Sequence, residues 1–89
     1  MSLGLAISQV AFYLGKMEDA EQAVKKSEVD LAKAVQDKAD DDTIKNLQEE
    51  LAKNKILFDL FKGFHEFWKD VIKAHKELIK QINELAFSR

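Results

Sequence analysis

Apolar residues recur along this chain with the seven-residue spacing of helices that pack along their whole length. The pattern covers about 3–38, and it resumes over about 43–87, which predicts two long helices. In the first segment the two repeating core positions hold Leu3, Val10, Met17, Val24 and Leu31, and Ala6, Tyr13, Ala20, Ser27 and Ala34. In the second segment they hold Ile44, Leu51, Phe58, His65, Ile72 and Ile79, and Leu47, Asn54, Phe61, Trp68, His75 and Ile82.

The stretch DKADDDT at 37–43 separates the two patterns. Clustered Asp and Thr residues favour a turn and can cap the helix that follows. We therefore expect a turn at about 39–42 and a chain that folds back on itself. The predicted fold is all-α: one domain over 1–89, built as a long, antiparallel, coiled-coil-like helical hairpin.

The apolar surface widens at the end of the hairpin opposite the turn, which we call the open end. There the flanks of both helices carry extra aliphatic and aromatic residues, more than two helices can bury against each other. We expect dimerisation to complete a four-helix bundle at this end. The residues expected at the interface are Leu5, Phe12, Leu57, Phe64, Phe67, Trp68 and Val71.

Gly63 leaves one alternative fold open. A break near this residue would let 64–87 turn back as a third helix and give a three-helix bundle within one chain. Glycine inside a helix costs only about 1 kcal/mol relative to alanine, so a continuous second helix is equally compatible with the sequence.

Composition narrows the class of protein. The absence of proline and the presence of only three glycines favour helices, while 46% hydrophobic and 34% charged residues argue against disorder. A net charge of −2 argues against nucleic-acid binding, and the lack of cysteine excludes thiol chemistry. We recognise no signal peptide and no transmembrane segment, so we expect a soluble chain, and no compartment is indicated.

The candidates for chemistry are few. His65 and His75 are ten residues apart, without the i, i+3 or i, i+4 partners of a helical metal site. Glu66 and Asp70 are surrounded by lysines, which favours a solvated charged face over paired catalytic carboxylates. We expect no enzyme, no metal site and no cofactor. One alternative remains, a helical bundle in which the two histidines ligate a cofactor such as haem.

The N-terminal stretch LGLAISQVAFYLGK, then a charged heptad helix, a turn and the segment FWKDVIKAHKELIKQI, resembles the helical alpha-pore-forming toxins of the cytolysin A, haemolysin BL, xenorhabdolysin and Cry6 type. In that family an apolar head precedes long amphipathic helices and enters the membrane when a ring assembles. The resemblance implies a membrane-contacting segment whose residues would be Leu3, Leu5, Ile7, Val10, Phe12 and Leu14.

We expect a non-catalytic assembly or protein-interaction module that self-associates through its open end. The expected partner is a second copy, with a larger helical protein as the other choice. The alternative function is that of a membrane-active, toxin-like protein, which the resemblance implies.

Overall fold

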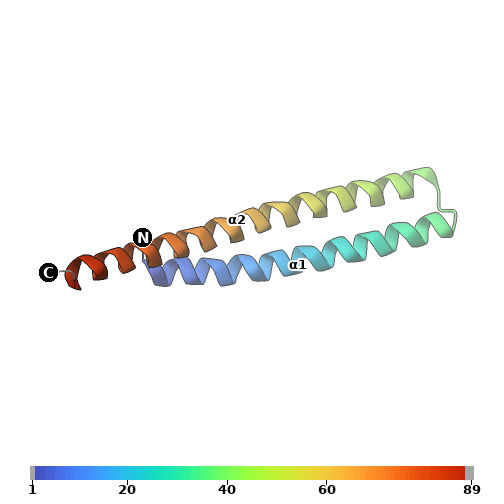
Figure 1. Cartoon of the computed structure of the whole chain (residues 1–89). Helices are drawn as coiled ribbons and strands as arrows, with labels where there is room; N and C mark the ends of the chain where they lie inside the picture. The colour runs from blue at the N-terminus through green and yellow to red at the C-terminus, as the bar shows by residue number, and fades with distance from the viewer. Residues whose placement is uncertain (1, 88–89) are drawn as a thin grey trace.

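The computed structural model describes residues 2–87 and consists of two α-helices joined by a short turn. Helix α1 spans Leu3–Gln36 and α2 spans Asp41–Phe87, and the two lie side by side in antiparallel directions (Figure 1). The molecule is a rod of 75 × 17 × 14 Å. The expected all-α helical hairpin is therefore confirmed. Helix α1 ends two residues earlier than expected, and α2 begins two residues earlier.

Backbone hydrogen bonds at the turn explain these boundaries. Ala39 N–H donates to the carbonyl of Ala34 at 2.9 Å, and Lys38 N–H donates to that of Val35 at 3.2 Å. This pair of bonds is the Schellman arrangement, which requires a left-handed residue after the C-cap, and Lys38 supplies it with φ 55°. Glycine usually takes this position, so a lysine gave no sequence signal that the helix ends at Gln36.

Asp40 begins the second helix as its N-cap. Its carboxylate Oδ1 accepts a hydrogen bond from Thr43 N–H at 3.1 Å, which satisfies one of the backbone donors that a helix N-terminus leaves unpaired. Asp41 and Asp42 follow in the first turn, where negative charge interacts favourably with the helix dipole. The expected capping role of the aspartate cluster is present, two residues ahead of the expected helix start.

Helix α2 continues without interruption through Gly63. The alternative of a three-helix bundle broken near Gly63 is therefore wrong. Phe61 and Trp68, on either side of the glycine, both remain on the half-buried face of α2, so packing against α1 continues across this point. That packing outweighs the cost of about 1 kcal/mol for one helical glycine.

Small residues of α1 make the closest contacts between the helices. Among the described residues only Ala6, Ala20 and Ser27 are buried, and all three occupy one heptad position of α1. The side-chain amide of Asn54 donates to Ser27 Oγ at 2.7 Å, which fixes the two helices relative to each other in the turn half of the hairpin. The larger heptad residues of α2 lie half-buried against this row, from Ile44 to His75. Small residues facing large ones allow two helices to pack closely.

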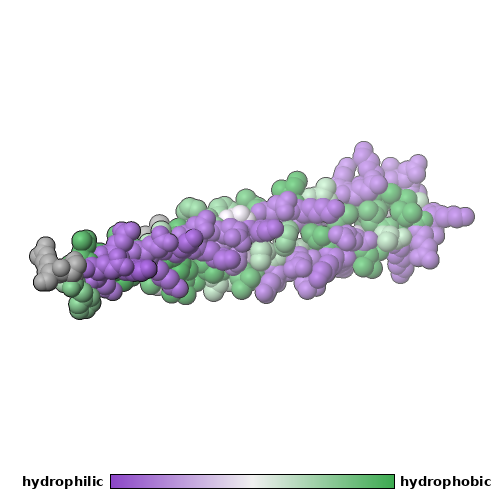
Figure 2. All heavy atoms as spheres, in the orientation of Figure 1, coloured by the Kyte–Doolittle hydropathy of each residue, from purple (hydrophilic) through white to green (hydrophobic). Residues whose placement is uncertain are grey.

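The C-terminal part of α2 extends past the beginning of α1 (Figure 1). Ile79 and Ile82 continue the α2 heptad but remain 47% and 55% exposed, because α1 supplies no residues alongside them. At the opposite end, hydrophilic side chains project around the turn (Figure 2). The expected contrast between a polar turn end and an apolar open end is present.

Candidate interaction surface

Aromatic rings from both helices gather at the open half of the hairpin. The Tyr13 ring stacks on that of Phe64 with centroids 5.1 Å apart, and lies 6.4 Å from that of Phe61. Phe12 meets Tyr13 edge-on at 5.0 Å. Such pairs contribute about 0.5–1.5 kcal/mol each beyond the apolar area that they bury. The cluster joins α1 to α2 and holds the rings in place.

A groove of about 560 Å³ lies along α2 beside this cluster. We call it the aromatic groove, and its lining residues are Tyr13, Asp59, Leu60, Gly63, Phe64, Phe67 and Trp68. A methyl group added at Gly63 would meet no atom within 4 Å, so the glycine leaves an open notch between the larger side chains. Asp59 is the one charged residue in the lining. The groove therefore suits an apolar side chain from another molecule.

The residues expected at the interface are accessible at their predicted positions. Five are exposed large hydrophobic residues, namely Leu5, Phe12, Leu57, Phe64 and Phe67. Trp68 and Val71 are half-buried, because they lie closer to α1. Trp68 also meets Phe67 edge-on at 5.3 Å. The hairpin thus leaves uncovered most of the surface that the sequence assigns to association.

Four lining residues of the groove were not among the expected interface residues, namely Tyr13, Asp59, Leu60 and Gly63. Tyr13 was assigned to the core between the helices, and Gly63 was considered only for whether it breaks α2. Leu60 is 49% exposed and lies one turn before Phe64 on the same face. The spacing of Leu60, Phe64 and Phe67 at i, i+4 and i+7 is the signal that would have added Leu60 to the expected interface.

The N-terminal set expected to contact a membrane divides into two groups. Leu3 and Val10 are half-buried on the seam with α2. The other members are exposed, namely Leu5, Ile7, Phe12 and Leu14. Across residues 2–87, neither helix has a stretch long and apolar enough to cross a bilayer.

The two histidines lie on the seam between the helices. The His65 side chain is 12% exposed, and its Nδ1 lies 3.9 Å from a carboxylate oxygen of Glu66. His75 is half-buried further along α2. Within the described part of the chain, no three His, Cys, Asp or Glu side chains gather in a way that could hold a metal ion.

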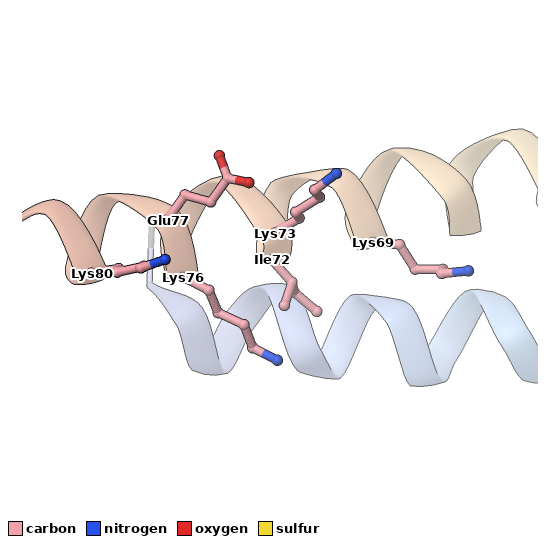
Figure 3. Close-up of a pocket in the computed structure, with 6 residues that line it drawn as sticks. All are labelled: Lys69, Ile72, Lys73, Lys76, Glu77 and Lys80. Carbon is pink, nitrogen blue, oxygen red and sulfur yellow. The ribbon is translucent and has the colours of Figure 1, made fainter.

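Four lysines surround Ile72 in a second groove at the open end, of about 420 Å³. Figure 3 shows Lys69, Lys73, Lys76 and Lys80 on successive turns of α2. The ammonium groups of Lys73 and Lys76 point to opposite sides of the helix, and Lys69 extends away from both (Figure 3). Because the charges diverge, they do not form a site that could surround one anion.

Comparisons with protein-family models, with curated proteins and with solved structures found no match to this chain.

Proposed function

We propose that this protein is a non-catalytic assembly module, a helical hairpin that self-associates through its open end into a four-helix dimer. The observation that carries the proposal is the surface area. The chain exposes 6920 Å², whereas a compact monomer of 10.2 kDa exposes about 5,300 Å². The excess of about 1,600 Å² per chain matches what one subunit buries in an obligate homodimer, roughly 1,000–2,500 Å².

The distribution of this surface favours association at the open end. The exposed aromatic residues Phe12, Phe64 and Phe67 all lie in the half of the hairpin away from the turn. Aromatic residues dominate the energetics of protein interfaces, since each buries a large apolar area with few rotatable bonds. Hydrophilic side chains instead project around the turn (Figure 2).

A second copy is the partner that the hairpin fits most directly. Two antiparallel hairpins that bury their apolar faces form a four-helix bundle, in which each helix contacts two neighbours. A net charge of −2 per chain gives little long-range repulsion between copies. Lysines and acidic residues alternate around the apolar face of α2, so a second copy can offer opposite charges at the rim.

The test compares the solution mass of a variant with a charge at the open end with that of a control variant with a charge in the turn half. Phe67→Glu removes an exposed apolar side chain from each copy, worth about 1.5–3 kcal/mol per residue, so we expect the dissociation constant to rise by roughly 10²–10⁴. Val29→Glu is the matched control, because Val29 is 65% exposed in the turn half of α1. Equal masses for both variants at all concentrations would contradict the proposal.

The exposed apolar residues Leu5, Ile7, Phe12 and Leu14 favour a second candidate function, contact with a lipid surface. They belong to a stretch of fifteen residues without a charged side chain. Co-sedimentation with liposomes separates the two functions. The assembly module remains in the supernatant, whereas a membrane-active protein sediments with the lipid and loses this property in Phe12→Glu.

A further inference from the structure

One row of apolar residues on α2 borders the seam with α1 and is only partly covered by it. It recurs every seventh position as Leu57, Phe64, Val71, Leu78 and Leu85. Leu57, Phe64 and Leu78 are 37%, 41% and 55% exposed, and Val71 is half-buried. The heptad residues that face α1 lie on an adjacent side of the helix. Helix α2 therefore has a second apolar row, as a helix with two neighbours in a bundle requires.

We propose that this row is the dimer contact, with α2 of one copy antiparallel to α2 of the other and a two-fold axis passing beside Val71. The inference rests on the proposed self-association and specifies its geometry. In a two-fold contact, residues at equal distances from the axis meet each other. Phe64 then lies opposite Leu78 of the second copy, and Val71, the smallest residue of the row, lies opposite itself.

The aromatic groove supplies the complementary shape. Its notch at Gly63 lies beside Phe64, so Leu78 of the second copy enters the groove between Leu60 and Phe67. The two-fold axis repeats this contact, and each copy both provides a groove and fills one. Close approach of two helices is favoured where one of them carries a glycine, because the missing side chain leaves room for the incoming residue.

The proposed dimer also covers the part of α2 that extends past α1, because Leu78 and its neighbours then pack on the second copy. The dimer is consequently longer than one hairpin, since the two copies overlap only at their open ends. The four helices lie side by side only near the axis, and three helices lie together over the rest of the overlap.

Spin-label distances test this geometry directly. The chain contains no cysteine, so single cysteines at exposed Lys55, Lys73 and Glu84 can each carry one nitroxide. With the axis at Val71 and 1.5 Å rise per residue, we expect a short separation for Lys73→Cys and about 40–50 Å for both Lys55→Cys and Glu84→Cys. Short separations at all three positions would mean a parallel dimer, which overturns the inference.

The same experiment separates failure of the geometry from failure of the proposed function. An antiparallel dimer centred on Phe64 would give about 30 Å for Lys55→Cys and about 60 Å for Glu84→Cys, which overturns the axis while self-association holds. A protein that stays monomeric, so that no distance between two labels is measured, would overturn both the proposed axis and the proposed self-association.

Gly63→Lys tests the groove independently of the labels. A Cβ atom added at Gly63 meets nothing within 4 Å in one hairpin, and this residue is exposed, so we expect the fold to be retained while the lysine side chain blocks the groove. We expect the dissociation constant to rise at least tenfold with unchanged helix content. Gly15→Lys is the control, because it changes a helical glycine of α1 at which an added Cβ likewise meets nothing within 4 Å. Equal dissociation constants for the two variants would show that Leu78 does not occupy the groove.

Discussion

Ser27 and Asn54 show how two polar residues are accommodated in an apolar seam. Ser27 is 5% exposed, and its hydroxyl oxygen accepts the hydrogen bond from the half-buried Asn54 amide at 2.7 Å. A buried polar group without a partner destabilises a fold, so this pair favours the one alignment of the helices in which both groups are satisfied. Polar residues at such positions are either tolerated in the packing or specify how the two helices align. The hydrogen bond favours the second.

Ser27→Ala tests this role at the residue scale. The substitution leaves the Asn54 amide without its partner, so we expect a loss of about 1–3 kcal/mol in the free energy of unfolding, measured with urea. The control is Ser8→Ala, at an exposed position of the same helix, which should change the free energy of unfolding by only a few tenths of a kcal/mol. The double variant Ser27→Ala with Asn54→Leu should recover stability, since neither polar group remains. An unchanged free energy of unfolding in Ser27→Ala would contradict this role of the hydrogen bond.

Asp40 makes stability depend on pH. Hydrogen bonds from the side chain and the backbone of Thr43 lower the pKa of its carboxyl group below the ordinary 3.8. A carboxylate with a lowered pKa stabilises the folded state fully above its unfolded-state pKa, and this contribution disappears as the pH falls through the folded-state pKa. Asp40→Asn preserves the cap without the charge, because asparagine is as good an N-cap.

We therefore expect Asp40→Asn to lose less stability than the unmodified protein between pH 5 and about pH 2. Urea midpoints measured across that range, with Asp19→Asn as an exposed control in α1, provide the comparison. Parallel pH profiles for Asp40→Asn and the unmodified protein would exclude this role of the carboxylate.

At the scale of the helices, heptad spacing predicted the seam well but predicted the ends of the helices less well. The repeat identified Ala6, Ala20 and Ser27, the three residues that are buried within 2–87, because burial in a two-helix hairpin follows a single periodicity. The end of α1 depends on the left-handed backbone conformation of Lys38, which the identity of this residue does not indicate. The extension of α2 beyond α1 follows from where the turn falls, and it leaves Ile79 and Ile82 outside the seam.

The aromatic groove was only partly predictable. Phe64, Phe67 and Trp68 were expected at an interface from their spacing, but the contribution of Tyr13 depends on how the helices align. That alignment depends on contacts between distant residues, such as the stacking of Tyr13 on Phe64. Local periodicity contains no information about such pairs, so the groove became apparent only in the folded hairpin.

Amide hydrogen exchange tests the α2 extension. In an isolated hairpin, residues 77–87 have no neighbouring helix, and a single helical segment of this length is marginal in water. We expect these amides to exchange much faster than those of 51–72 at low protein concentration, and to gain protection as concentration rises. Protection that does not change with concentration would show that a second copy does not cover this segment.

At the scale of the whole molecule, the hairpin has too little interior for its size. Its radius of gyration is 20.9 Å, whereas a compact domain of 89 residues has one of about 12 Å. None of the described large apolar side chains is fully buried. Since burial of apolar surface is the main term that offsets the loss of chain entropy, we expect two helices with so small a core to gain substantial stability from association.

The solution mass, measured by sedimentation equilibrium without lipid or detergent, tests the central claim most directly. Self-association through the open end predicts twice the chain mass of 10.2 kDa, persisting on dilution through the micromolar range. A mass of 10.2 kDa at every concentration, with the helices still formed, would contradict it.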